Sequence, residues 1–366
     1  MFSNSAIVLK MQRKFIIGDI HGCFDELTEL LEKAGLTDED LLISLGDIVD
    51  RGSKSKEVYE YLRNRPNTMV LMGNHERKHL NGILSYAQDI VKVQFGADYA
   101  SFLEWLASLG YYYETEEAII VHAAFEHDLP LNAQKPEVLS GSTAGERFLE
   151  KKYGTAYWTD HYSGEKPVIY GHHVVGATPE IKNNTYGIDT GACHGGWLTA
   201  IELPGFMIHQ VKSPADYWVA EQKAWQLPVL AAKDWLNMGF DAIRKQLSKL
   251  SFVDDGPVKQ ALDELSNWIV GLEAQLPIIK GELGIFTATL LEKYPDTFNF
   301  EASKFPFKTF LYKSKANNLT IADLQKSLDN PVKINALANE LNIKPITSPA
   351  FFNLSFAVTL QHYTSS

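Results

Sequence analysis

Five short apolar runs in this chain each end at residues that can bind a metal ion or carry a proton. The runs lie at 15–17, 42–45, 69–72, 118–121 and 168–170. The polar residues that follow them are Asp19 with His21, Asp47, Asn74 with His75, His122 and His172. Because the strands of α/β folds deliver functional groups at their carboxyl ends, we expect these side chains to share one site. Carboxylate, amide and imidazole ligands together are typical of a hydrolase with two metal ions.

The ligands divide into two sets. Asp19 and His21 alternate, so in extended backbone their side chains face the same side, and Asp47 at the next strand end could bridge two ions. The neutral ligands of the second ion would be Asn74, His122 and His172. Oxygen and imidazole donors together suit Mn²⁺, Fe or Zn²⁺, of which Mn²⁺ is our first choice. Two such ions would activate a bridging water for in-line attack on phosphorus.

Three further residues have side chains that can assist phosphate chemistry. His75 follows Asn74 and points elsewhere on an extended path, which leaves it available as a general acid for the leaving oxygen. Asp50 could orient that imidazole, as a carboxylate does for a catalytic histidine. Arg51 has the fork geometry that binds two phosphate oxygens.

A structural explanation exists for each of these residues taken singly, because Asp, Asn and Gly are common in turns. Their joint occurrence after successive strands favours the catalytic explanation. Two histidines follow Gly171; the Gly-His register favours His172 as the ligand, and a structural or pH-tuning role stays open for His173. Cys23 and Cys193 are interpreted as small buried residues, not as nucleophiles.

Strands and helices alternate around the polar residues. Apolar residues at helical spacing predict helices at 24–35, 53–64, 76–94 and 98–109. Together with the strands before and after them, the first two helices give the βαβ rhythm of a mostly parallel sheet. Paired strands are expected within 185–210, with 197–203 the clearest.

Length and composition limit the other possibilities. The 366 residues suffice for about two domains, which we place at 14–213 (catalytic) and 214–366 (mainly helical), after an N-terminal extension at 1–13. The net charge of −11 disfavours an extended nucleic-acid or membrane-binding surface. The chain has only two cysteines, no apolar run of membrane length, and no basic residue before the apolar patch at 6–9. These features predict a cytoplasmic protein without a membrane partner.

Three blocks carry a family resemblance: Gly-Asp-Ile-His-Gly at 18–22, Gly-Asp-Ile-Val-Asp-Arg-Gly at 46–52 and Gly-Asn-His-Glu at 73–76. Together they resemble the phosphoprotein phosphatase branch of the calcineurin-like metallophosphoesterases. The resemblance continues through His122, His172 and the turn at 189–191, and so extends over roughly 14–210. It implies an α/β fold in which two β-sheets form a sandwich flanked by helices, here followed by the helical C-terminal region.

The resemblance also implies a dinuclear metal centre at the strand ends. One ion would be held by Asp19, His21 and Asp47. The other would be held by Asp47, Asn74, His122 and His172. Arg51 would bind phosphate, and His75 with Asp50 would form the acid pair.

Departures from the family pattern bear on the substrate. The protein Ser/Thr phosphatases carry a second phosphate-binding arginine between the fourth and fifth ligands, where this chain has Trp-Thr-Asp-His at 158–161. Their Ser-Ala-Pro-Asn-Tyr block is also missing, and the layout is similar to bacterial members such as symmetrical diadenosine tetraphosphate hydrolases and phage-type broad phosphatases. The candidate substrate contacts are Arg51, Asn74, Arg147 and His161.

We therefore expect a phosphomonoesterase, in the first place a Ser/Thr or broad-specificity protein phosphatase, that acts on a phosphorylated protein or a small phosphoester. A first alternative with the same site chemistry is symmetrical hydrolysis of dinucleoside tetraphosphates, or hydrolysis of RNA-cap-like pyrophosphates. A second alternative is a regulatory or scaffold protein whose phosphatase domain serves the C-terminal helices.

Overall fold

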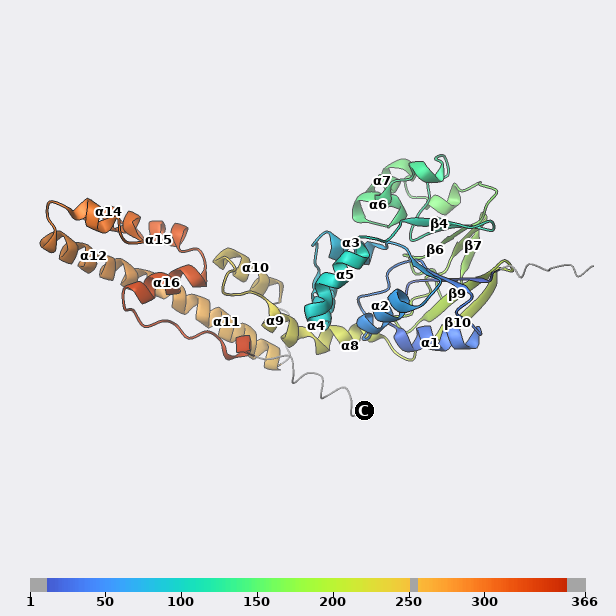
Figure 1. The fold of residues 1–366 in the computed structure, drawn as a ribbon, viewed down its shortest axis with the longest axis horizontal. Helices are drawn as coiled ribbons and strands as arrows, with labels where there is room; N and C mark the ends of the chain where they lie inside the picture. Colours follow the sequence, from blue (N-terminus) through green and yellow to red (C-terminus); the bar gives the residue numbers. More distant parts are fainter. Residues whose placement is uncertain (1–11, 251–255, 354–366) are drawn as a thin grey trace, which may run out of the picture. The chain divides into compact units, whose positions relative to one another are not determined.

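The computed structural model of the chain describes residues 12–250 and 256–353. The chain divides into two units, one ending at Trp225 and the other beginning at Gln226 (Figure 1). The boundary predicted at 213/214 lies before helix α8 (Tyr217–Ala224), which the first unit includes. Within that unit, the hydroxyl of Tyr217 donates to Oε1 of Glu26 at 2.7 Å. Most of the extension predicted at 1–13 lies outside the described residues.

Two five-stranded sheets form the centre of the first unit (Figure 1). In spatial order, the first contains β10 (Met207–Lys212), β9 (Trp197–Leu203), β1 (Lys14–Ile17), β2 (Leu41–Ser44) and β3 (Thr68–Val70). The second contains β4 (Tyr112–Glu114), β5 (Ile119–Val121), β6 (Val168–Tyr170), β8 (Thr185–Gly187) and β7 (Glu180–Lys182). The runs β1-β2-β3 and β5-β6-β8 are parallel, and the remaining pairs are antiparallel.

The two faces of each sheet bury different neighbours. On β1, Ile16 packs in the core between the sheets, which also contains Ile120 of β5 and Ile169 of β6. Phe15 and Ile17 belong to another cluster, formed with the helices that cover the first sheet. This division follows from the two-residue period of a strand. The predicted β-sandwich flanked by helices is thereby confirmed.

Helices cover the outer face of each sheet. The first sheet is covered by α1 (Phe24–Lys33), α2 (Ser55–Asn64), α4 (Tyr86–Phe95) and α5 (Tyr99–Leu106). The second packs against α6 (Pro136–Leu139) and residues of α7 (Thr143–Tyr153). The helix predicted at 76–94 is in fact two, α3 (Asn74–Leu80) and α4, because Gly82 adopts a left-handed φ of 65° that ends the first.

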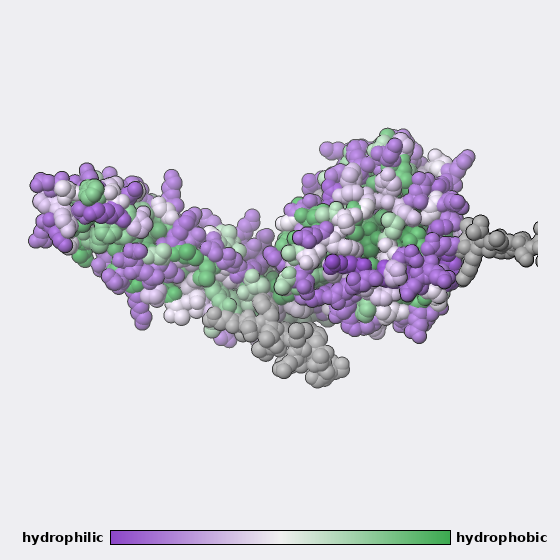
Figure 2. Space-filling view, in the orientation of Figure 1, coloured by the Kyte–Doolittle hydropathy of each residue, from purple (hydrophilic) through white to green (hydrophobic). Residues whose placement is uncertain are grey.

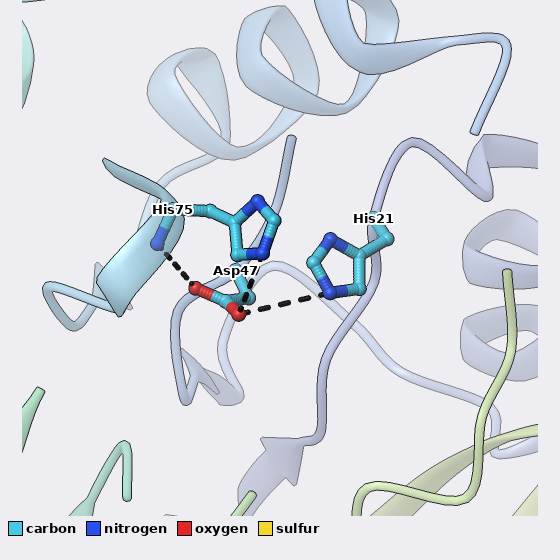
Figure 3. Close-up of side chains that lie close together, drawn as sticks. All are labelled: His21, Asp47 and His75. Atoms are coloured by element: carbon cyan, nitrogen blue, oxygen red, sulfur yellow. Dashed lines mark hydrogen bonds and ion pairs between the residues drawn. The ribbon is translucent and has the colours of Figure 1, made fainter. Parts of the chain in front are cut away.

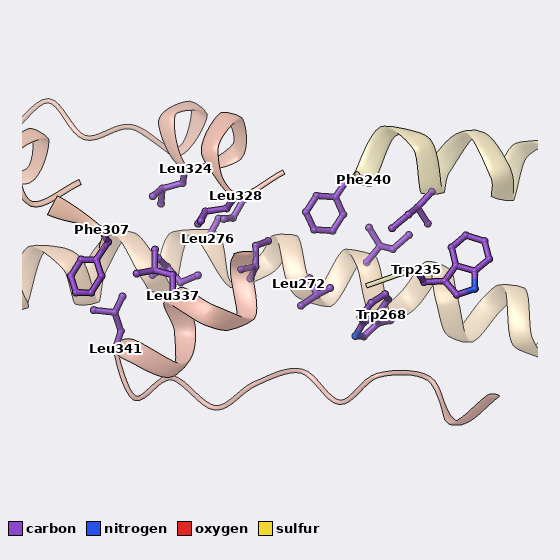
Figure 4. Packing of buried hydrophobic residues seen from close by; sticks show 14 of the residues in the cluster. Trp235, Phe240, Trp268, Leu272, Leu276, Phe307, Leu324, Leu328, Leu337 and Leu341 are labelled. Atoms are coloured by element: carbon purple, nitrogen blue, oxygen red, sulfur yellow. The ribbon is translucent and has the colours of Figure 1, made fainter. Parts of the chain in front are cut away.

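The second unit is helical and has its own core. Its longest helices are α11 (Gly256–Ala274) and α12 (Leu276–Lys293), and Trp235, Phe240, Trp268 and Leu272 are among the buried residues (Figure 4). The others are α9 (Gln226–Ala232), α10 (Phe240–Lys249), α13 (Phe298–Ala302), α14 (Lys308–Lys315), α15 (Ile321–Ser327) and α16 (Pro331–Glu340). The predicted helical C-terminal region is confirmed.

Apolar side chains also reach the surface of the second unit. Val270, Ile278, Ile285 and Phe300 are each more than half exposed, and hydrophobic colouring is visible along this unit in Figure 2. Among the residues that the structure describes, no helix combines the length and the apolar character that crossing a bilayer requires.

Candidate active site

The polar residues at the strand ends occupy unusual backbone conformations. His21, Asp47, Asp50, Arg51 and His172 all have positive φ angles, between 46° and 72°. Residues with a side chain seldom adopt this left-handed region, and strain of this kind concentrates at functional sites. Strands β1, β2 and β6 are therefore each followed by a sharp turn that carries polar side chains of the site.

Glycines of the sequence blocks allow the carboxylates to approach the backbone closely. A Cβ atom on Gly73 would lie 2.2 Å from Oδ1 of Asp47, and one on Gly171 would lie 2.2 Å from Oδ1 of Asp19. Both separations are far below van der Waals contact, so a side chain at either position would displace the neighbouring carboxylate. The glycines beside Asn74 and His172 are thus required by the geometry of the site.

Asp47 lies at the centre of the site (Figure 3). Its Oδ2 is 3.6 Å from Nε2 of His21 and 3.9 Å from Nε2 of His75, and its Oδ1 is 3.5 Å from Nε2 of His122. The backbone N–H of His75 donates to Oδ1 at 2.9 Å. Burial by itself raises the pKa of Asp47, but the surrounding imidazoles outweigh it and hold the pKa below its usual range. The carboxylate is therefore ionised.

One ring nitrogen of His122 and one of His172 lie near Asp47, and the hydrogen bonds of the opposite nitrogens indicate which tautomer each neutral ring would adopt. Nδ1 of His122 lies 3.0 Å from the carbonyl oxygen of Leu45 and must donate to it, which leaves a lone pair on Nε2. Nε2 of His172 lies 3.0 Å from Oε1 of Glu146, which likewise leaves the lone pair on Nδ1. Burial lowers the pKa of His122 to about 4, so this ring is neutral at pH 7.

The amide of Asn74 completes this group of acceptors. One terminal atom of the amide lies 2.9 Å from Oδ2 of Asp47, 3.1 Å from Nδ1 of His172 and 3.3 Å from Nε2 of His122. If that atom is the nitrogen, it donates to these acceptors. If it is the oxygen, four electron-rich groups converge on one point, which only a cation can stabilise. The donor set therefore fits a divalent metal ion.

A second concentration of negative charge lies around Asp19. This buried carboxylate accepts the backbone N–H of His172 at 3.1 Å. Burial and the charges of Asp189 and Asp47 raise its pKa well above the usual value. Bound cations would reverse that shift, because they favour the ionised form. Donor atoms of His21, Asp47 and His75 lie within 4.8 Å of one another, as do those of Asp47, His122 and His172.

His75 and Arg51 lie beside the candidate metal ligands. Nδ1 of His75 is 2.6 Å from Oδ2 of Asp50, and its Nε2 is 3.2 Å from Nη2 of Arg51. Nη1 of the same guanidinium is 3.2 Å from Nε2 of His21. The structure thus brings together Asp50, Arg51 and His75, as the sequence predicted. The guanidinium of Arg51 contacts the imidazoles of both His21 and His75.

The two remaining candidates lie in different surroundings. Arg147 lines a cavity of about 490 Å³ together with His172 and His173. His161 is exposed, stacks on Tyr153 with ring centroids 4.5 Å apart, and does not line that cavity. Their roles in substrate binding stay predictions.

Several residues of the site were missed by sequence reasoning. His79 and Gln88 both contact the buried carboxylate of Asp50, and Glu146 contacts His172. His79 carries a signal that was available, because it lies one helical turn after His75 on α3. Glu146 carries none, since it reaches His172 only through the packing of α7.

The comparisons with known proteins agree with this geometry. The family model described as calcineurin-like phosphoesterase matches residues 13–190. An asymmetrical bis(5'-nucleosyl)-tetraphosphatase PrpE from Bacillus cereus is 30% identical over 244 residues, which cover 57% of this chain and 96% of the relative. A PrpE protein from Halalkalibacterium halodurans is 31% identical over 225 residues, which cover 52% of this chain and 89% of the relative.

The chain therefore belongs to the calcineurin-like metallophosphoesterase family, as its three sequence blocks implied, and is a metal-dependent phosphatase. Among solved structures, a metallophosphoesterase from Sphaerobacter thermophilus aligns with a TM-score of 0.37 and 18% identity, covering 58% of this chain and 91% of its own. A protein serine/threonine phosphatase from Saccharomyces cerevisiae aligns with a TM-score of 0.40 and 17% identity, covering 56% and 80%.

Proposed function

We propose that this protein is a dinuclear metal-dependent hydrolase whose substrate is a dinucleoside tetraphosphate. The observation that supports the chemistry is the convergence of an ionised, buried Asp47 with ring nitrogens of His122 and His172, all within 4.8 Å of one another. The substrate class is supported by the PrpE relatives, which are named as tetraphosphatases. This chain matches 96% and 89% of the length of the two relatives.

The metal ligands in this proposal are those predicted from the sequence. Asp19, His21 and Asp47 would hold one ion. Asp47, Asn74, His122 and His172 would hold the other. When bound, the ions would supply Lewis acidity to the phosphate and lower the pKa of a water molecule. Manganese is the first metal to test, with iron and zinc as alternatives.

The other side chains position and protonate the substrate. Arg51 binds two oxygens of the reacting phosphate, because its guanidinium already lies between His21 and His75. As the general acid, His75 would have to carry a proton on Nε2, which here accepts from Nη2 of Arg51 at 3.2 Å, and give it to the leaving oxygen once the substrate displaces that contact. Asp50 holds Nδ1 of that ring and stabilises the imidazolium form before the transfer.

The test uses the full-length protein reconstituted with Mn²⁺ and incubated with diadenosine tetraphosphate. Chromatography of the products separates asymmetrical cleavage, which yields AMP and ATP, from symmetrical cleavage, which yields two ADP. We expect hydrolysis that EDTA abolishes and that Asp47→Asn reduces by at least about 10²-fold, since it alters the central ligand. Intact substrate under all metals would refute the proposed substrate.

A phosphorylated protein is the second candidate substrate. It was our first expectation from the sequence, and it is supported by the contact of Arg51 with His75 and of His75 with Asp50, which suits a single phosphate ester. A phosphoserine peptide assayed beside diadenosine tetraphosphate ranks the two substrates by kcat/KM.

The cytoplasmic location of the protein stays a prediction.

A further inference from the structure

A cavity of about 470 Å³ opens beside the candidate active site, between α3 and the start of α7. Its lining includes Asn74 and His172 from the site, Lys78 from α3, and Ser142 and Thr143 at the start of α7. We call it the α3–α7 cavity. Its volume lies within the range of small-molecule sites, roughly 300–1,000 Å³.

Most charged side chains of this cavity already have partners. Nη2 of Arg77 donates to Oε1 of Glu137 at 2.5 Å. Oε1 of Glu146 lies 3.0 Å from Nε2 of His172. Lys78 differs, because no carboxylate lies within 4 Å of its ammonium group in the part of the chain that the structure describes. The charge of Lys78 contributes to lowering the pKa of Glu146 in the same cavity, but Lys78 forms no ion pair within 4 Å among the described residues.

The start of α7 adds positive potential to the same wall. The helix is 11 residues long, and Oγ of its N-cap Ser142 accepts the N–H of Gly145 at 3.3 Å. The N–H groups of Thr143 and Ala144, both of which line the cavity, have no carbonyl partner within the helix. The N-terminus of a helix attracts anions. The charge of Lys78 and the N-terminus of α7 therefore both attract an anionic ligand.

We propose that the α3–α7 cavity binds the phosphate chain of the substrate beyond the reacting phosphate, with Lys78 as its principal charged contact. The inference rests on the proposed function, because the cavity shares Asn74 and His172 with the candidate metal centre. A phosphate chain whose reacting end lies at the candidate metal centre can therefore continue along the protein surface into the α3–α7 cavity. We therefore expect Lys78 to affect substrates with several phosphates and not substrates with one.

The test compares two substrates in the Mn²⁺-loaded, full-length protein. For Lys78→Ala we expect KM for diadenosine tetraphosphate to rise at least about fivefold, and for Lys78→Glu at least about tenfold. KM for p-nitrophenyl phosphate should stay within a factor of two in both variants. The matched control is Lys151→Ala, an exposed lysine of α7 that does not line the cavity.

Two results would overturn the inference: no change in KM for either substrate, or an equal rise for both. The proposed function can fail separately, if p-nitrophenyl phosphate is hydrolysed but diadenosine tetraphosphate is not. In that case inorganic tripolyphosphate, supplied as its manganese complex, serves as an inhibitor of the remaining activity. Lys78→Glu should then raise the Ki of tripolyphosphate about tenfold and leave that of orthophosphate unchanged, and equal shifts would again refute the site.

If neither substrate is hydrolysed, a measurement of tripolyphosphate binding tests the inference instead. The thermal shift of the wild-type protein with the manganese complex of tripolyphosphate is compared with that of Lys78→Glu. A shift in the wild type that the variant loses supports the cavity as an anion site, and equal or absent shifts refute it.

Discussion

Nδ1 of His75 lies 2.6 Å from Oδ2 of Asp50, and both side chains are buried. The same carboxylate also contacts Nε2 of His79 at 3.0 Å through its other oxygen, and Gln88 donates to it. Burial by itself raises the pKa of Asp50, but His79 and His75 outweigh it and hold the pKa below the usual range. Asp50 is therefore a fixed, ionised group that orients His75.

Replacing His75 should reveal a general acid through its dependence on the leaving group. We expect His75→Asn to lower kcat about 10²–10³-fold with phenyl phosphate, whose leaving phenolate needs a proton. With p-nitrophenyl phosphate the loss should be less than about tenfold, because that leaving group departs unprotonated. His127→Asn, at an exposed histidine, is the control. Equal losses with both substrates, or unchanged turnover, would remove the acid assignment.

Glu146 should affect metal binding through His172. Its Oε1 lies 3.0 Å from Nε2 of His172, and carboxylates that bond to a ligating histidine raise its basicity. We expect Glu146→Gln to weaken Mn²⁺ binding about tenfold, measured by calorimetry on the metal-depleted full chain. Glu165→Gln, an exposed glutamate, is the control and should bind as the wild type does. Equal affinities in both variants would show that Glu146 is not coupled to the metal.

Asp40 should make the first unit sensitive to acid. Its carboxylate accepts from Nη2 of Arg13 and from the backbone N–H of Thr37, both at 2.8 Å. Burial alone raises its pKa, but these bonds outweigh it and lower the pKa from 3.8 to about 2. Because the folded-state pKa is lowered, the stabilisation is complete above the unfolded value near 3.8 and is lost as the pH falls through about 2.

The corresponding variant is Asp40→Asn, followed by urea unfolding between pH 7 and pH 2. We expect it to lower the free energy of unfolding at pH 7 by about 1–2 kcal/mol, and this difference from wild type should shrink below pH 4. Asp38→Asn, at an exposed neighbour, should change little. A difference that is independent of pH would assign the effect to packing instead of ionisation.

Truncation tests where the catalytic unit ends and whether the C-terminal unit only regulates it. A chain that ends at Trp225 keeps α8, in which Gln222 accepts from the hydroxyl of Tyr86 at 2.8 Å. We expect this chain to retain its melting temperature and its activity on p-nitrophenyl phosphate. A chain that ends at Ser213 should melt at a lower temperature, since it loses the contact of Tyr217 with Glu26. Inactivity of the longer chain would show that residues 226–366 support catalysis.

The sequence alone was sufficient for the five strands that precede the site residues and for the polar residues at their ends, but not for β7. Periodic apolar residues and the glycines beside Asp47, Asn74 and His172 are local features, and each reflects a local constraint on the backbone. The helix predicted at 76–94 was wrong in its middle, because apolar spacing continues past the break at Gly82. The C-terminal unit was predicted to be helical from its Ala, Leu and Trp residues between successive prolines, but no pattern there indicates a function.

Contacts between residues far apart in the chain could not be predicted from the sequence and became visible only in the folded protein. Glu146 reaches His172, and Lys78 shares a cavity with Thr143, because α7 packs beside α3 and the end of β6. Such pairs leave no periodic or spacing signal, since their proximity depends on how whole layers pack. The sequence therefore determined the chemistry of the strand ends, and the packing of helices around them determined the shape and charge of the space that a substrate enters.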